Sequence, residues 1–163
     1  MYISNEIANK YNYDLDELAR VAIENTMRLH PATLEPLDSF KDPEDRRMLN
    51  DIDVKEFTDD DAFVLSNNTQ ICGAATLFYP GAKEKIAVYL GDDFYAIPSS
   101  IHEFIIVPCG GPMTVEYLEE VLVGANKTVV KPEDILGESV LKYSYMENKL
   151  DFARDMEFSE ELE

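Results

Sequence analysis

The first strong pattern in the chain is helical. In residues 14–30, apolar or small side chains recur every three or four positions, which is the spacing of one face of an α-helix. Asp14 stands at the N-cap position and Glu17 follows three residues later, as in a capping box. Prolines at 31 and 36 end the pattern. The sequence therefore predicts an amphipathic helix of about four turns. Its apolar face holds Leu15, Leu18, Ala19, Ala22, Thr26 and Leu29.

The pattern weakens between this helix and residue 62. Residues 32–40 read as extended chain, and residues 42–49 predict a short helix with Pro43 in its first turn. Residues 50–61 are too acidic to belong to a core, and the run Asp59, Asp60 and Asp61 lacks the alternating ligands and the glycine of a calcium loop. We interpret this stretch as a solvated connection that separates a helical front part from the rest.

From residue 62 onward the pattern changes to short strands. Residues 62–68 predict one strand and residues 71–80 a second. Residues 81–90 predict a helix that Gly91 caps. Two apolar runs, 94–98 and 101–108, then flank the turn residues Pro98, Ser99 and Ser100, which predicts an antiparallel hairpin. Because residues 104–107 are all apolar, this strand should be central and covered on both faces.

The last part of the pattern adds one helix and one strand. Residues 114–124 predict a helix capped by Thr114 and closed by Gly124, and Lys131–Asp134 predicts a single helical turn. Residues 139–145 alternate, with Leu141 and Tyr143 on one face and Lys142 and Ser144 on the other, so we expect a half-exposed last strand. The fold class is α+β, with an antiparallel or mixed sheet of about five strands and helices packed on it.

These elements predict one domain and a tail. The domain spans residues 1–145, with a helical front part in 1–50 and a sheet-rich part in 62–145, and an acidic C-terminal tail spans 146–163. In the tail, apolar side chains alternate with acidic ones. Two interpretations stay open: a partly ordered helix that docks on the domain, or a flexible segment that orders on a partner.

Charge changes the picture more than any other bulk property. Among 163 residues, 33 acidic side chains face 14 basic ones, which gives a net charge of −19. Such a surface repels phosphates, so we expect no direct binding to nucleic acid or to anionic membranes. The sequence instead favours a basic protein surface as the partner, including one that normally holds nucleic acid and is blocked by charge mimicry. The alternative is that the charge serves only solubility.

The remaining composition indicates a cytoplasmic protein. No apolar run is long enough to span a bilayer, and the first residues lack the pattern of a secretory signal. Two cysteines, Cys72 and Cys109, do not make a disulfide framework, so we expect both thiols to be reduced. No phosphate-binding glycine motif is present, although Gly110–Gly111 before the helix at Thr114 resembles an anion site weakly. We therefore expect no cofactor.

Several motifs carry a family resemblance. They are Gly73–Ala74, the run Phe78–Gly81, Leu90–Asp92 with Tyr95, and the run Pro98–Glu103. In this order they resemble a bacterial family known as domain of unknown function 5688, found largely in gut Firmicutes. Residues 24–31 and 130–140 are similar as well, so the resemblance covers about residues 14–145. It implies no activity, cofactor or partner, because none is established for that family, and the tail after Tyr145 departs from its pattern.

The run Pro98–Glu103 also holds the residue types of a hydrolase. Ser99, Ser100, His102 and Glu103 could supply a serine nucleophile, a base and an acid. Neighbours on a strand point to opposite faces, however, so His102 and Glu103 should not touch, and no G-x-S-x-G elbow is present. A polar turn explains the same residues. As an exposed turn it could instead bind a partner together with nearby aromatic side chains, and our candidate binding residues are Tyr79, Tyr95, Ser99, Ser100, His102 and Glu103.

The cysteines offer two further kinds of site. Cys72, Cys109, His30 and His102 could hold zinc if the fold gathered them, but no two of them have the short spacing that marks a zinc site, so we expect no metal. Cys109 could also be a thiol nucleophile with His102 as its base. The sequence thus favours a non-enzymatic binding or regulatory domain. The rival hypothesis is a small hydrolase or thiol enzyme that uses His102 with Ser99, Ser100 or Cys109.

Overall fold

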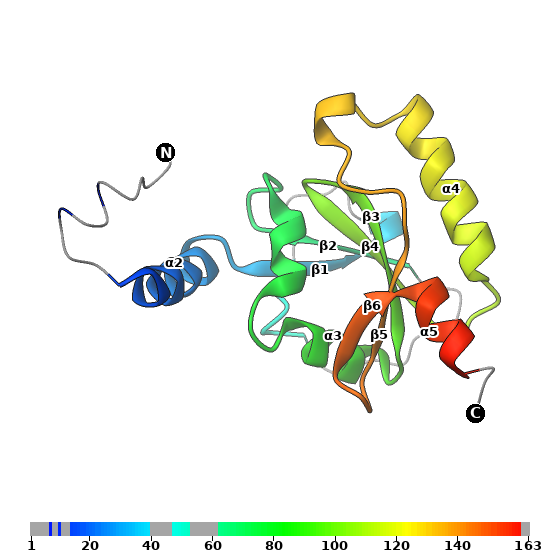
Figure 1. The fold of residues 1–163 in the computed structure, drawn as a ribbon, viewed down its shortest axis with the longest axis horizontal. Coiled ribbons are helices and arrows are strands. Elements are labelled where there is room, and N and C mark those ends of the chain that lie inside the picture. The colour runs from blue at the N-terminus through cyan, green and yellow to red at the C-terminus, as the bar shows by residue number, and fades with distance from the viewer. Residues whose placement is uncertain (1–6, 8–9, 11–13, 40–46, 53–61, 161–163) are drawn as a thin grey trace.

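The structure is a computed structural model that describes residues 7, 10, 14–39, 47–52 and 62–160 (Figure 1). The short helix predicted in residues 42–49 falls mostly outside this part of the chain, and the acidic connection, with Asp59, Asp60 and Asp61, does so as well. Nearly all of the other predicted elements lie within the described residues.

The centre of the molecule is one antiparallel sheet of six strands with the order β1-β2-β4-β3-β5-β6. The α+β fold class is therefore confirmed, with one strand more than the five or so expected. The strands are β1 (Ala32–Pro36), β2 (Phe63–Asn67), β3 (Phe94–Ser100), β4 (Glu103–Pro108), β5 (Leu141–Ser144) and β6 (Lys149–Phe152). β3 and β4 form the predicted hairpin at the middle of the sheet. The predicted turn at Pro98–Ser100 is wrong, because β3 continues through Ser100 and the chain turns at residues 101–102.

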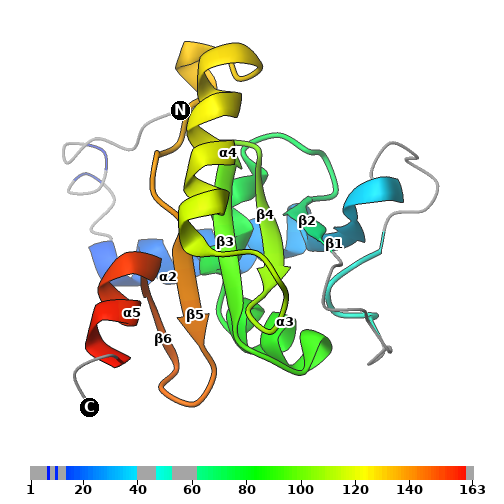
Figure 2. The same ribbon diagram turned by 90° about the vertical axis from the view of Figure 1, so that its right-hand side faces the viewer.

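Helices cover both faces of this sheet (Figures 1 and 2). One face carries α3, and the opposite face carries α4 and α5. The described helices are α2 (Leu15–Leu29), α3 (Ala82–Leu90), α4 (Val115–Thr128) and α5 (Ala153–Glu160), with 3-10 turns η1 (Leu37–Ser39), η3 (Gly73–Phe78) and η4 (Pro132–Asp134). α2 begins at the predicted cap, where the Asp14 side chain accepts a hydrogen bond from the Asp16 N–H. It extends away from the sheet on the side opposite α4 (Figure 1).

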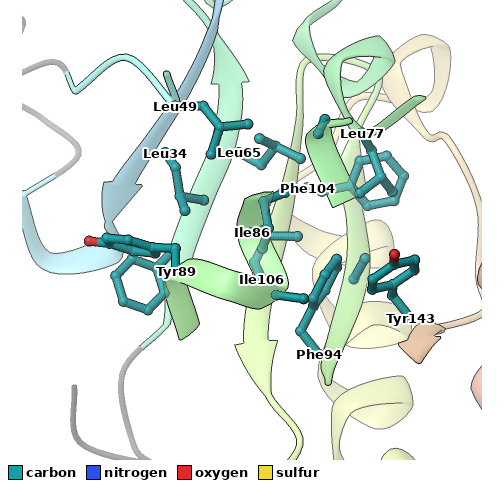
Figure 3. Packing of buried hydrophobic residues seen from close by; sticks show 14 of the residues in the cluster. Leu34, Leu49, Leu65, Leu77, Ile86, Tyr89, Phe94, Phe104, Ile106 and Tyr143 are labelled. Atoms are coloured by element: carbon teal, nitrogen blue, oxygen red, sulfur yellow. The ribbon is translucent and has the colours of Figure 1, made fainter. Parts of the chain in front are cut away.

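The larger core fills the space between the sheet and the layer of α3 and η3 (Figure 3). Phe94 and Tyr143 from β3 and β5 pack with their ring centres 5.2 Å apart, and Ile86 of α3 is fully buried against the sheet. A second core lies under α4, where Val115, Leu118 and Leu122 contact the other face. Since residues of β4 are buried on both faces, the prediction of a doubly covered central strand is confirmed.

The predicted strand at residues 71–80 is wrong, because these residues form the 3-10 turn η3. Cys72 has a left-handed backbone with φ of 51°, which turns the chain out of an extended path immediately before η3. The Thr76 hydroxyl then donates to the Gly73 carbonyl at 2.7 Å and stabilises the turn. An apolar run of this length does not by itself distinguish a strand from a buried helical turn.

The predicted end of α4 at Gly124 is also wrong, since the helix continues to Thr128. The side chain of Asn126 is buried and its amide donates to the Gly137 carbonyl at 2.9 Å, which ties the last turn of the helix to the following loop. The Thr128 hydroxyl donates to the Gly124 carbonyl at 2.8 Å. These contacts outweigh the cost of one glycine inside the helix.

The C-terminal part of the chain differs from the expected tail. β5 is not the last strand, because residues 149–152 pair with it as β6 and place Asp151 opposite Lys142. Lys142 and Ser144 are consequently buried and not half exposed. Helix α5 follows directly, and Ala153 and Met156 are buried under it. In this segment Leu150 packs against the larger core and Ala153 belongs to the second core.

Candidate functional site

Three loops meet at the turn between β3 and β4, and the contacts there define a hairpin-tip cluster. The cluster comprises Ser99, Ser100, His102, Glu103, Cys72 and Asp134. The Ile101 N–H donates to the Asp134 carbonyl at 2.8 Å, and the Ala74 N–H donates to the Ile101 carbonyl at 3.3 Å. The turn is thus joined to the loop before η3 on one side and to η4 on the other.

Both ring nitrogens of His102 have a neighbour. Nδ1 accepts a hydrogen bond from the Cys72 N–H at 3.1 Å, and Nε2 lies 3.6 Å from Asp134 Oδ1. Accepting at Nδ1 means that the neutral ring carries its proton on Nε2, which faces the carboxylate. A general base needs a free lone pair directed at the nucleophile. In this arrangement His102 has no such lone pair for Ser99 or Ser100.

The hydroxyls of the two serines, at the end of β3, are occupied by contacts within the hairpin. The Ser100 hydroxyl accepts from the His102 N–H at 3.0 Å, and the Ser99 hydroxyl donates to Glu103 Oε1 at 3.2 Å. Such bonds between a polar side chain and nearby groups are typical of tight turns. The expected separation of His102 from Glu103 is consistent with their contacts, because each has a different partner.

Two residues of this region were not among the sequence candidates. Asp134 lies thirty-two positions after His102 and reaches it only through η4, so no local pattern could indicate the pair. Gly73 lies under the turn, where a Cβ atom would be 2.2 Å from Ser66 Oγ and 2.5 Å from the His102 carbonyl oxygen. Ser66 donates to that same carbonyl at 2.8 Å. Glycine is therefore the only residue that fits at position 73, where the backbone approaches Ser66 and the His102 carbonyl closely.

Cys109 lies far from the hairpin tip. It follows β4, whereas His102 precedes it, and seven residues of extended chain span roughly 23 Å. Burial raises the pKa of the Cys109 thiol to about 12, with Asp92 and Asp93 adding to the increase and Lys142 opposing it. The thiol is consequently protonated near neutral pH, whereas a nucleophilic cysteine needs the thiolate.

The four possible zinc ligands are not brought together. Cys72 contacts His102 through its backbone N–H, while Cys109 lies at the other end of β4 and His30 ends α2. Among the described residues, no group of three or more histidine, cysteine, aspartate or glutamate side chains could hold a metal ion. Both cysteines are free thiols.

The two candidate tyrosines occupy different places. The Tyr79 hydroxyl donates to the His30 carbonyl at 3.1 Å, and its ring lines a small pocket of about 140 Å³ with Met27, Pro31 and Lys85. Tyr95 is buried on the other face of the sheet, near Cys109. The six predicted binding residues thus lie in three separate regions, and only four of them form one cluster.

A groove on the outer side of α4 was missed by the sequence analysis. It lies between α4, α5 and the loop before β5, has a volume of about 490 Å³, and is named here the α4 groove. Its charged lining consists of Glu116, Glu119, Glu120, Lys127, Glu138 and Arg154. The sequence indicates this groove only weakly. Along α4 the residues that line the groove alternate with buried residues, and Glu138 comes close to them only in the folded protein.

The carboxylates of the α4 groove differ in their pairing. Glu119 accepts a hydrogen bond from Arg154 Nε at 2.6 Å and forms an ion pair with its guanidinium. Glu116, Glu120 and Glu138 have no hydrogen-bond or ion-pair partner in the part of the chain that the structure describes. Tyr117 and Val121 are exposed next to them on the same helix. The groove therefore offers three unpaired negative charges beside apolar contact surface.

Comparison with known proteins identifies one family. The model of a family described as "Family of unknown function (DUF5688)" matches residues 1–145, which confirms the resemblance read from the motifs. Neither the curated proteins nor the solved structures contain a match to the chain. Within the described residues, no helix is both long and apolar enough to cross a membrane.

Proposed function

The chain belongs to the DUF5688 family of unknown function, and we propose that it is a non-enzymatic binding or regulatory domain. It engages a basic protein surface, and the α4 groove is the place of contact. The observation that supports this proposal is a set of three glutamates around one groove, Glu116, Glu120 and Glu138, for which the described residues supply no hydrogen-bond or ion-pair partner. Arginine or lysine side chains of a partner would enter the groove and pair with them.

The geometry of the groove suits such a partner. The carboxylates of Glu116, Glu120 and Glu138 converge on one groove but are themselves exposed, so each pairing with a basic side chain would be weak and several would act together. Exposed Tyr117 and Val121 would add apolar and aromatic contact, which is common at protein interfaces. Because the net charge is −19, a basic partner would also be attracted over a distance and associate faster.

A sharper form of the proposal is charge mimicry. In this form the partner is a protein whose basic groove normally holds nucleic acid, and the acidic surface occupies that groove. Nucleic acid should then displace the protein from its partner, and added salt should weaken the complex. A partner that binds both ligands at once would exclude mimicry but not the binding role.

The rival enzymatic hypothesis receives less support from the geometry. His102 uses Nδ1 for the Cys72 N–H and faces Asp134 with Nε2, so it has no lone pair for a serine. Cys109 lies at the other end of β4 with a pKa raised to about 12. We favour a structural role for the hairpin-tip cluster, which fixes three loops, and a cytoplasmic setting in which both free thiols stay reduced.

The proposal is tested by measuring the affinity for an arginine-rich peptide with calorimetry. Removing two of these charges with Glu116→Gln and Glu120→Gln should raise the Kd roughly two- to thirtyfold, because each exposed pair contributes about 0.2–1 kcal/mol. The control variant carries Glu133→Gln and Glu147→Gln, which remove the same charge from exposed positions outside the groove. It should change the Kd less than twofold. Equal weakening by both variants would mean general attraction to a polyanion and would refute the groove.

A further inference from the structure

Helix α2 is strongly amphipathic, yet the domain does not cover its apolar face. None of its fifteen residues is buried. Leu15 is 63% exposed and Leu29 is 55% exposed, although both belong to the predicted apolar face, named here the α2 stripe (Leu15, Leu18, Ala19, Ala22, Thr26 and Leu29). A fifteen-residue helix is only marginally stable in water without packing. The helix would therefore be stabilised by another apolar surface packed against the stripe.

The domain holds α2 at its C-terminal end and on a different side. Met27 packs against the larger core, and the His30 carbonyl accepts a hydrogen bond from the Tyr79 hydroxyl at 3.1 Å. At about 100° per residue, Met27 points roughly 140° away from Ala22 at the middle of the stripe. The α2 stripe is thus exposed, and Figure 1 shows the helix projecting from the molecule on the side opposite α4.

The charges of α2 are kept away from the stripe. Glu17, Arg20, Glu24 and Arg28 follow one another at helical spacing on the reverse side, where Arg20 and Glu24 form a 2.6 Å ion pair. Two arginines balance three acidic residues within α2, whereas the whole chain carries −19. Two copies of so acidic a protein would repel each other over most of their surfaces. Because α2 carries little net charge, two copies can approach each other through this helix.

The stripe is also complementary to itself. Leu15 and Leu29 each lie seven positions from Ala22, and Leu18 and Thr26 each lie four positions from it. If two α2 helices cross antiparallel at Ala22, the small alanines meet at the centre and each terminal leucine meets the opposite leucine of the other copy. The acidic first turn then lies at the level of the other copy's Arg28. Such pairing is the isologous contact of a two-fold dimer.

We propose that α2 is a self-association helix through which two copies of this chain form an antiparallel dimer centred on Ala22. A helix of this length is roughly 22 Å long, which gives a contact at the small end of specific interfaces. The dimer should accordingly be reversible, with a Kd on the order of micromolar. Because α2 and α4 lie on opposite sides, each dimer presents two α4 grooves to the outside (Figure 1).

The proposal is tested by sedimentation of the full chain over a concentration series. The wild type should change reversibly from monomer to dimer. Ala22→Lys places a charge at the centre of the contact and should raise the Kd at least tenfold, while lysine preserves the helix. The matched control Glu24→Lys adds the same residue to the charged side and should change the Kd less than threefold. A monomer at every concentration, or equal effects of both variants, would overturn the proposal.

Cross-linking provides a second measurement that does not rely on a destabilising charge. In a chain with Cys72→Ser, an added Ala22→Cys should form a disulfide dimer on mild oxidation, since the two positions meet at the two-fold axis. Leu15→Cys should not cross-link to itself, because fourteen residues of helix separate the two copies of position 15 by roughly 21 Å. Efficient cross-linking at position 15 and none at position 22 would contradict the antiparallel dimer.

Discussion

His102 fixes the shape of the hairpin tip through three different groups. Its Nδ1 accepts from the Cys72 N–H, its backbone N–H donates to the Ser100 hydroxyl, and its carbonyl accepts from the Ser66 hydroxyl. The bonds to Cys72 and Ser66 join two other stretches of chain to the turn, and the bond to Ser100 closes the turn itself. The serines and the histidine that resemble catalytic residues are therefore explained by the hydrogen bonds that this half-buried turn requires.

Gly73 is the position beneath this turn where a side chain cannot fit. Gly73→Ala places a Cβ atom within 3 Å of Ser66 Oγ, the His102 carbonyl and the Asn67 nitrogen. Two of these atoms are backbone, so we expect a loss of about 2–3 kcal/mol in the free energy of unfolding, measured with urea.

The matched control is Gly124→Ala in α4. A Cβ atom there meets nothing within 4 Å, and alanine favours a helix over glycine, so this variant should gain about 0.5–1 kcal/mol. Equal stabilities of the two variants would contradict the close packing at Gly73.

The two thiols should differ sharply in reactivity. Cys72 is exposed, whereas burial raises the pKa of Cys109 to about 12. Alkylation by iodoacetamide near pH 8 should modify Cys72 first, and mass spectrometry should show modified Cys109 only after unfolding in urea. Because the pKa of Cys109 is higher in the folded protein than in the unfolded one, the thiol's contribution to the stability of the fold is complete below the unfolded pKa near 9. It is lost as the pH rises toward 12. Fast native labelling of Cys109 would revive the thiol-enzyme hypothesis.

The helices and strands could be predicted where the pattern of side chains is local. Asp14 and Thr114 cap α2 and α4 as predicted, and β3 and β4 form the predicted hairpin, although its turn is at Ile101–His102. The predictions fail where contacts between residues far apart in the sequence determine the local structure. η3 replaces a strand because Gly73 packs against the turn from β3 to β4, and α4 passes Gly124 because Asn126 binds the Gly137 carbonyl. The contact of Asp134 with His102 has the same origin, since η4 brings it from far along the chain.

The C-terminal segment was hard to predict because its many acidic residues are typical of an exposed tail, whereas a few of its apolar residues are buried. Lys149–Phe152 alternates polar and apolar residues only briefly, and β6 becomes evident only beside β5. In helix α5, Ala153 then packs in the second core and Met156 is buried, although acidic residues neighbour them in the sequence. An acidic segment can thus be part of the fold when a few apolar positions face inward.

Docking of α5 is tested with two methionines. Met156 is 6% exposed and Met146 is 91% exposed. Met156→Ala should lower the free energy of unfolding by about 2 kcal/mol or more, because it removes buried methylene groups and leaves a cavity. Met146→Ala should change it by less than about 0.5 kcal/mol. A negligible effect at Met156 would mean that α5 does not stabilise the domain.

Over the whole molecule, the acidic surface has two regions with opposite character. α2 is nearly balanced in charge and carries the uncovered apolar stripe, whereas the α4 groove gathers unpaired glutamates. The two regions lie on opposite sides of the sheet (Figure 1). In the account proposed here, the first joins two copies of the chain and the second binds a basic partner, so a dimer would bind a repetitive partner with higher avidity.

The proposed binding role depends on where a basic ligand contacts the protein. The most direct measurement is a titration of the isotope-labelled chain with the arginine-rich peptide, followed by the NMR shift of each backbone amide. We predict the largest shifts along Glu116–Lys127, at Glu138 and at Arg154, and a strong reduction in about 0.5 M NaCl. Shifts that are spread evenly over the acidic surface, or that are largest at residues 99–103, would contradict the α4 groove as the binding site.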